Sequence, residues 1–154
     1  MFTSRIITRG LFLIMFLLIS VACGKDDPDR IAEKDREKIL DYIQENDIDA
    51  IEHDSGVFYQ ITREGSGGHP TRNSMVKISY TGTLLNGKVF DSRNSWSTYL
   101  YNTILGWQYG IPLFKRGGAG ILIVPSGLGY GEWPRMNIPA HSILIFEIEL
   151  EDFI

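Results

Sequence analysis

The chain has 154 residues, of which 44% are hydrophobic, and this length and composition suit one globular domain with short extra segments. Its single cysteine excludes an internal disulfide framework. The net charge of −4 comes mainly from residues 24–50, and no basic stripe with interleaved aromatic residues is present, which argues against a nucleic-acid-binding protein.

Residues 1–22 have the pattern of a secretory signal rather than of a folded element. Basic residues precede the apolar run Leu11–Ile19, which is too short to span a bilayer comfortably. The sequence Ser20–Cys23 resembles a bacterial lipobox, whose cysteine is acylated, although leucine is usual where Ser20 stands. We therefore expect Cys23 to anchor the protein by lipid in the bacterial cell envelope, at the outer membrane on its periplasmic or surface side. The alternative is an ordinary signal peptide with an unpaired cysteine nearby.

A polar tether and a helix are expected next. Residues 23–28 are acidic and contain a proline, as in a flexible linker. Asp29–Asn46 has a narrow apolar stripe among many charges, so residues 29–50 are predicted to form an N-terminal helix and spacer. The stripe consists of Ile31, Ile39, Leu40, Tyr42 and Ile43. Three alternatives are open for this helix: it lies on its own domain, it forms a homodimer or docks a partner, or it is partly disordered.

Two strands and a hairpin turn are predicted after the helix. Gly56–Arg63 is rich in β-formers, and Met75–Leu84 alternates between apolar and polar side chains, which is typical of a strand with one buried face. Asn86–Gly87 is a strong hairpin signal because both positions accept a positive φ. We expect Lys88–Asp91 to be the returning strand and Arg93–Leu100 to be irregular.

A short helix is predicted at Leu105–Lys115, where apolar residues recur at helical spacing. Gly106 and Gly110 should let another element approach this helix closely. Pro112 should end it, because proline lacks the N–H that a helix interior needs.

Two more strands, Ile121–Val124 and Ser142–Glu151, are separated by a long loop and complete the domain, residues 56–154. The predicted fold class is α+β: an antiparallel β-sheet wrapped around one short α-helix, preceded by the N-terminal helix.

Residues that usually bind metals or act as nucleophiles are not grouped in this sequence. His53, His69 and His141 are widely spaced and no cysteine or carboxylate cluster joins them, so we expect no metal. Ser126–Gly127 does not complete a nucleophile elbow, and the later glycines precede no helix that could help to bind phosphate. No cofactor is expected, and the aromatic residues remain as the candidate site.

Several different short motifs follow one another at a characteristic spacing between residues 56 and 154. They are Tyr80–Gly82, Gly87–Ser92, Ile104–Trp107, Gly117, Pro125, Leu128–Gly131, Ile138–Pro139 and Phe146. Each is weak alone, but in this order the chain resembles the FKBP-type peptidyl-prolyl cis–trans isomerases over its whole globular part. The fold of that family agrees with the one predicted above.

The resemblance implies an apolar pocket that binds proline. Trp107 would form its floor, while the Tyr130 hydroxyl and the main-chain N–H of Ile104 would each bind a carbonyl of the substrate. Tyr80 and Asp91 would complete the catalytic set with Tyr130, and Asp91 would accept hydrogen bonds at the rim. Further walls of the pocket would come from Phe90, Ile138 and Phe146.

Some residues depart from the family's pattern. Thr103 and Asn137 stand where aliphatic residues are usual, and Arg93 is the nearest candidate for the arginine that often partners the aspartate. The loop after Arg93 is atypical, and either Tyr99 or Tyr101 would supply another aromatic wall; Tyr99 is included among the candidate substrate contacts. These departures bear on substrate preference more than on fold.

The leading functional hypothesis is a peptidyl-prolyl cis–trans isomerase that assists the folding of envelope proteins. Its partners would be polypeptides that contain proline and, through the lipid, a membrane; a homodimer through the N-terminal helix is a further expectation. Two alternatives are a weakly active or inactive chaperone of the same fold and an accessory lipoprotein of an envelope machine, such as one for gliding motility. No nucleic-acid partner is expected.

Overall fold

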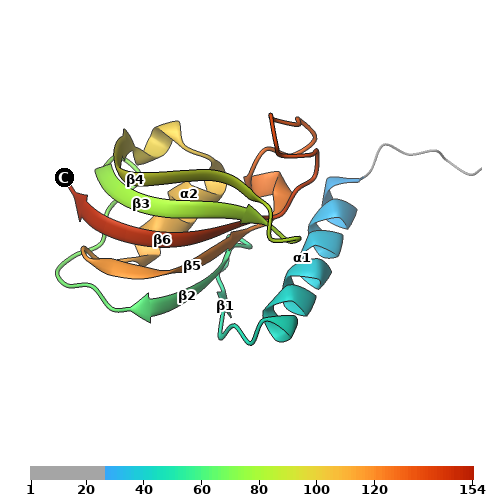
Figure 1. Ribbon diagram of the computed structural model, residues 1–154, viewed down its shortest axis with the longest axis horizontal. Coiled ribbons are helices and arrows are strands. Elements are labelled where there is room, and N and C mark those ends of the chain that lie inside the picture. The colour runs from blue at the N-terminus through green and yellow to red at the C-terminus, as the bar shows by residue number, and fades with distance from the viewer. Residues whose placement is uncertain (1–26) are drawn as a thin grey trace, which may run out of the picture.

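The computed structural model describes residues 27–154, which form an antiparallel sheet with a long helix at one end (Figure 1). The predicted signal segment, residues 1–22, and the predicted lipid site Cys23 lie outside the described residues. Helices and strands follow in the order α1 (Pro28–Glu45), β1 (Ile51–Glu52), β2 (Phe58–Arg63), β3 (Met75–Leu84), β4 (Val89–Tyr99), α2 (Leu105–Gly110), β5 (Gly118–Val124) and β6 (Leu144–Phe153). Short 3-10 segments are η1 (Leu100–Asn102), η2 (Ile111–Leu113) and η3 (Ser126–Leu128). From residue 27 onward, no helix is long and apolar enough to cross a membrane.

The six strands pair in the order β1–β2–β5–β6–β3–β4, and each of these pairs is antiparallel. In Figure 1, α2 crosses behind the sheet, and α1 lies at the end of the sheet near the β3–β4 turn. This arrangement confirms the predicted α+β class. The two-residue strand β1 was not predicted, because so short a segment has no pattern of its own.

Strands β3 and β6 lie side by side and supply much of the core. Val76, Ile78 and Tyr80 of β3 are buried, while Lys77 between them is exposed. Successive side chains of a strand point to opposite faces, so the predicted alternation is realised. The predicted hairpin turn is confirmed as well, with Gly87 at φ 78°.

Helix α2 packs closely on β5, as its glycines predict. A Cβ atom at Gly106 would collide with the side chain of Val124, and one at Gly110 would collide with Leu122. The helix ends at Gly110 and continues as the 3-10 segment η2, which contains Pro112. This close approach brings Trp107 of α2 onto the inner face of the sheet, where it is 3% exposed.

Strand β4 differs from the prediction: it does not stop at Asp91 but runs from Val89 to Tyr99. Its pairing with β3 shifts at two places, and each shift leaves one extra residue on β4. A bulge interrupts the period-two pattern by which strands are recognised, so residues 93–100 looked irregular. At the second bulge Ser95 has φ 50°, and its N–H donates to Ser79 Oγ at 2.8 Å.

Helix α1 begins and ends within one residue of the prediction. Pro28 occupies its first turn, where the missing N–H costs nothing, and the Asp27 carboxylate accepts the Asp29 N–H at 3.2 Å. The guanidinium of Arg36 pairs with the Glu52 carboxylate at 2.7 Å, which ties α1 to β1.

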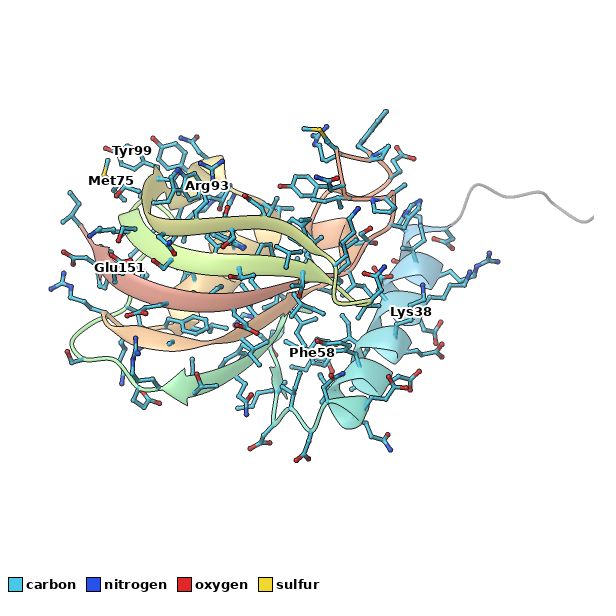
Figure 2. The ribbon with its side chains drawn as sticks, in the orientation of Figure 1. Lys38, Phe58, Met75, Arg93, Tyr99 and Glu151 are labelled. Atoms are coloured by element: carbon cyan, nitrogen blue, oxygen red, sulfur yellow. The ribbon has the colours of Figure 1, made fainter. Side chains whose placement is uncertain are left out.

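The buried side of α1 rests on its own domain. Ile39 is fully buried, and Figure 2 shows Phe58 of β2 in the space between the sheet and α1. Leu40, which the predicted stripe includes, is 39% exposed instead. The helix therefore lies on its own domain, as the first of the three alternatives expects. Ile39 packs in a separate core cluster with Phe58, Ile123, Ile143 and Ile145.

Candidate functional site

A cluster of aromatic rings lies between α2 and the inner face of the sheet. Trp107 is at its centre: the centroid of its ring is 4.9 Å from that of Tyr80, 5.3 Å from Phe146 and 6.3 Å from Trp96, all edge-on. Phe90 completes the set with a centroid 5.6 Å from Phe146. Edge-on pairs of this kind each contribute about 0.5–1.5 kcal/mol beyond the area that they bury. We call Tyr80, Phe90, Trp96, Trp107 and Phe146 the aromatic cluster.

The indole N–H of Trp107 is buried and has no hydrogen-bond partner among the described residues. Buried donors without a partner are rare in folded proteins. This feature sets Trp107 apart from an ordinary core tryptophan.

Tyr80 and Asp91 form a short hydrogen bond at the edge of the cluster. The Tyr80 hydroxyl donates to Asp91 Oδ2 at 2.5 Å, and the Arg93 Nε lies 3.7 Å from the same oxygen. Burial raises the pKa of the Tyr80 phenol well above its ordinary value, and the hydrogen bond to Asp91 raises it further. At neutral pH the phenol is therefore a proton-bearing donor, not a nucleophile.

Arg93, the nearest candidate in the sequence for a partner of the aspartate, forms an ion pair with Asp91. Its guanidinium also lies 5.4 Å from the ring centroid of Trp96, which allows a cation–π contact. Figure 2 shows Arg93 and Tyr99 along the outer edge of the sheet formed by β4.

Two bulges in β4 aim its aromatic residues at the site. Gly82 pairs with Asp91 and Thr83 with Val89, so Phe90 is the extra residue at the first bulge. Its ring lies over Gly82, where the absence of a Cβ makes room for it. The second bulge brings Trp96 opposite Ile78, and residues directly opposite on paired strands share a face. Trp96 therefore reaches the cluster from a segment in which no strand was predicted.

The turn before α2 holds Ile104 at the edge of the cluster. The Ile104 carbonyl accepts the N–H groups of Trp107 and Gln108, while its own N–H donates to no group within residues 27–154. Thr103, a departure from the family's pattern, has a structural reason: its hydroxyl donates to the Leu100 carbonyl at 2.6 Å and closes η1. The Gln108 side chain donates to the Thr103 carbonyl at 2.7 Å and fixes the turn from the other side.

Residues 126–143, which we call the Tyr130 loop, close another side of the site. Tyr130 is half-buried against the core cluster that contains Trp107, and Ile138 is 7% exposed in the same cluster. The Tyr130 hydroxyl has no hydrogen-bond partner in the described part of the chain, and the Arg135 guanidinium lies 5.4 Å from its ring centroid.

Asn137, the other departure from the family's pattern, lies in the tight turn between Arg135 and Ile138. The main-chain groups of these two residues exchange hydrogen bonds of 2.9 and 3.0 Å. Asn137 has φ 79°, a conformation that asparagine adopts more readily than an aliphatic residue does.

The structure therefore brings together eight of the nine candidate site residues and leaves out Tyr99. Tyr99 is 41% exposed and stacks on Tyr101 with centroids 5.2 Å apart, so these two rings contact each other and Tyr99 is not part of the cluster. The ring that the sequence reasoning missed is Trp96, whose position opposite Ile78 becomes visible only once the bulge is known. The eight are Tyr80, Phe90, Asp91, Ile104, Trp107, Tyr130, Ile138 and Phe146.

Two of the three histidines, His53 and His69, have structural partners elsewhere. His53 Nδ1 is 2.9 Å from the Ser55 hydroxyl, and His69 Nδ1 is 2.8 Å from the Pro112 carbonyl. No group of three histidine, cysteine or carboxylate side chains suited to a metal occurs among residues 27–154.

Comparison with known proteins gives one family. A model of the family described as FKBP-type peptidyl-prolyl cis-trans isomerase matches residues 67–151. Among curated proteins, the FKBP-type peptidyl-prolyl cis-trans isomerase FkpA of Buchnera aphidicola (subspecies Schizaphis graminum) is 44% identical over 103 residues, 64% of this chain and 41% of its own. A probable FKBP-type isomerase of Haemophilus influenzae is 34% identical over 141 residues, covering 86% of this chain and 58% of the relative.

Solved structures have the same fold. The crystal structure of FkpA from Escherichia coli has a TM-score of 0.67 and 28% identity, covering 81% of this chain and 63% of that one. A peptidyl-prolyl cis-trans isomerase from Pseudomonas syringae pv. tomato has a TM-score of 0.71 and 26% identity, covering 84% and 98%. The chain spans only about two fifths of the FkpA sequence that it matches at 44% identity, of which 41% is covered.

Proposed function

The chain belongs to the FKBP-type peptidyl-prolyl cis–trans isomerase family, and we propose that it isomerises X–Pro peptide bonds in polypeptides. The observation that carries the proposal is the aromatic cluster centred on Trp107, with two unpaired donors, the Ile104 N–H and the Tyr130 hydroxyl, at its edge. No nucleophile, metal or cofactor is needed for this reaction, because no bond is broken.

Rotation about the X–Pro amide is slow because resonance holds the bond planar, with a barrier of about 18–20 kcal/mol. The planar form is more polar than the twisted one, so an apolar surface such as that of Trp107 and Phe146 disfavours the ground state relative to the transition state. Each 1.4 kcal/mol of difference accelerates the rotation about tenfold.

Hydrogen bonds to the substrate would hold the twisted amide. We assign the Ile104 N–H and the Tyr130 hydroxyl to substrate carbonyls, and Phe90 and Ile138 to the walls around the proline ring. Tyr80, whose hydroxyl already donates to Asp91, orients that carboxylate, which is 42% exposed and accepts hydrogen bonds from the substrate. Tyr99 would contact substrate residues beyond the proline.

An isomerisation assay with a proline-containing peptide tests this function. We expect the chain to accelerate isomerisation, Trp107→Ala to remove most of the activity, and Tyr130→Phe to lower kcat/KM by about 2- to 12-fold, the equivalent of one hydrogen bond. The matched control is Tyr109→Phe, which removes a phenol hydroxyl from a 45% exposed tyrosine of α2. No rate above background, or equal rates for all variants, would overturn the proposal.

We also propose that the protein acts in the bacterial cell envelope with a lipid on Cys23. The basic, apolar and small residues before this cysteine support the proposal. Mass spectrometry of the mature N-terminal peptide from bacterial cells should show the added acyl groups, and Cys23→Ser should lack them. An unmodified thiol would contradict the lipid anchor.

A homodimer through α1 is a narrower proposal. Leu40, with 39% of its surface exposed, supports it as an apolar contact on the outer side of the helix. Sedimentation analysis should then give a mass that rises with concentration and that falls back in Leu40→Lys. A monomer at every concentration would contradict it.

Binding of unfolded polypeptides without catalysis is a second candidate function. It is favoured by Trp133 and Met136 of the Tyr130 loop, which are 66% and 89% exposed beside the site. If they bind clients, replacing both with serine should reduce the suppression of aggregation and leave the peptide isomerisation rate unchanged. Unchanged suppression would remove this candidate.

A further inference from the structure

Asp35 is a buried acidic residue in α1 that the proposed chemistry does not use. It is 2% exposed, and its carboxylate Oδ2 accepts the main-chain N–H of Ser126 at 2.8 Å. The two residues are 91 positions apart, and α1 lies before the part of the chain that the family model matches, which begins at residue 67. A buried carboxylate is costly unless it makes hydrogen bonds, so its position in the fold calls for a reason.

Ser126 is the first residue of the Tyr130 loop, and its main chain holds the turn that carries Tyr130. Its carbonyl accepts the N–H of Gly129 at 3.0 Å and that of Gly131 at 2.9 Å, and these glycines flank Tyr130 on both sides. Gly131 has φ 57°, so the backbone takes a left-handed turn conformation directly after Tyr130. The peptide units of Ser126 thus link Asp35 on one side to the two neighbours of Tyr130 on the other.

Helix α1 is also attached to its domain by contacts other than that of Asp35. Ile39 is buried in the core, and the Arg36–Glu52 ion pair joins the helix to β1. A hollow of about 1150 Å³ lies between α1 and the loop, and Ser126 is one of its lining residues; others include Ile31, Arg36, Leu128 and His141. The side chains of the helix and the loop therefore do not fill the space between them. Where packing leaves room, the directional hydrogen bond from Ser126 to Asp35 has more influence on the position of the loop than it would have in a filled interface.

We propose that Asp35 is a positioning residue for the isomerase site: by holding Ser126 it fixes the loop that carries Tyr130. The N-terminal helix is then a working part of the enzyme and not only a spacer. This inference rests on the proposed function, because it concerns how the Tyr130 hydroxyl is held for the substrate.

Substitutions at Asp35 in the full chain test the proposal. Asp35→Asn keeps an acceptor oxygen, whereas Asp35→Leu keeps a similar size and removes it. We expect Asp35→Leu to lower kcat/KM by about 2- to 12-fold, as loss of one hydrogen bond would, and Asp35→Asn to stay near the parent. Arg36→Gln is the matched control: it removes the ion pair of the adjacent residue and should leave kcat/KM unchanged.

A double-mutant cycle separates positioning from a general loss of stability. In the Tyr130→Phe background, Asp35→Leu should lower kcat/KM little further, because both changes act through the Tyr130 hydroxyl. The inference is wrong if the losses of kcat/KM from Asp35→Leu and Tyr130→Phe multiply in the double variant. It is also wrong if Asp35→Leu has the kcat/KM of the parent, or if Arg36→Gln lowers kcat/KM as much as Asp35→Leu does. Asp35→Ala replaces the leucine variant if that variant does not fold.

Amide hydrogen exchange gives a measurement that does not depend on catalysis. Exchange of the Ser126, Gly129 and Gly131 N–H groups should be faster in Asp35→Leu than in the parent and close to the parent in Asp35→Asn. Unchanged exchange overturns the inference even in an active enzyme. If the parent has no isomerase activity, the proposed function fails, and these three amides still decide whether Asp35 holds the loop.

Discussion

Gly82 of β3 shows how the absence of one Cβ shapes the site. The ring of Phe90 lies over this glycine, with its Cζ 2.5 Å from where a Cβ would be. The same ring packs edge-on against Phe146, 5.6 Å away between centroids. A larger residue at position 82 must push the ring away, because aromatic rings have little freedom to deform.

We predict that Gly82→Ala lowers the free energy of unfolding by about 1–3 kcal/mol, the usual cost of overpacking, and lowers kcat/KM because Phe90 shifts. Urea unfolding and the peptide assay measure the two effects. Gly68→Ala is the matched control, since a Cβ there meets no atom within 4 Å and its φ is not positive. Equal stability and activity in both variants would show that Phe90 can move without cost.

Most residues of the candidate site could be predicted at this scale, because each belongs to a short motif whose spacing is visible in the sequence. Trp107 and Phe146 meet as the resemblance implies, and Tyr80 contacts Asp91. Asp35 could not be predicted, because its contact with Ser126 spans 91 positions and one acidic residue in a charged helix carries no signal.

At the scale of elements, Glu151 of β6 joins three strands at one end of the sheet. Its carboxylate accepts hydrogen bonds from Ser79 of β3 at 2.6 Å and from Ser95 of β4 at 2.8 Å, and pairs with Lys77 at 3.0 Å. The hydrogen bonds from Ser79, Lys77 and Ser95 lower the pKa of Glu151 to about 2. The second bulge of β4 supplies Ser95, so this contact also pins the register that brings Trp96 inward.

The lowered pKa of Glu151 predicts how stability depends on pH. The folded state binds this proton more weakly than the unfolded chain, whose pKa is near 4.5, so the stabilisation is complete above pH 4.5 and is lost as the pH falls towards 2. Solvent screens the group, and the effect should be modest. The free energy of unfolding should fall more between pH 6 and pH 3 in the parent than in Glu151→Gln. Equal pH dependence would contradict the assignment.

Elements with an uninterrupted pattern could be predicted, and those with bulges could not. The α1 boundaries, the Asn86–Gly87 turn and the alternation of β3 and β6 follow from local periodicity and turn preference. In β4 each bulge shifts the alternation by one residue, so a continuous strand reads as a short strand followed by a loop. Bulges are decided by contacts with the neighbouring strand, which a local pattern does not contain.

At the scale of the whole molecule, a second core cluster lies between α1 and the sheet. Ile39 is fully buried there, whereas its neighbour Leu40 is 39% exposed. We predict that Ile39→Ala lowers the free energy of unfolding by about 2–5 kcal/mol, because it leaves a cavity. Leu40→Ala should change it by less than about 1 kcal/mol, since Leu40 lies at the surface and belongs to neither core cluster. Urea unfolding distinguishes them, and similar losses would show that α1 is not docked as described.

Strand β6 comes last among the described elements, yet it lies between β5 and β3 in the middle of the sheet. Before residues 144–153 of a nascent chain have been synthesised, β5 and β3 each have an unpaired edge. Unpaired strand edges can form hydrogen bonds with other chains. Synthesis proceeds from the N-terminus, so the sheet closes only when its final segment arrives. A protein proposed to help others fold is itself aggregation-prone until that moment, and premature termination before β6 should yield an insoluble product.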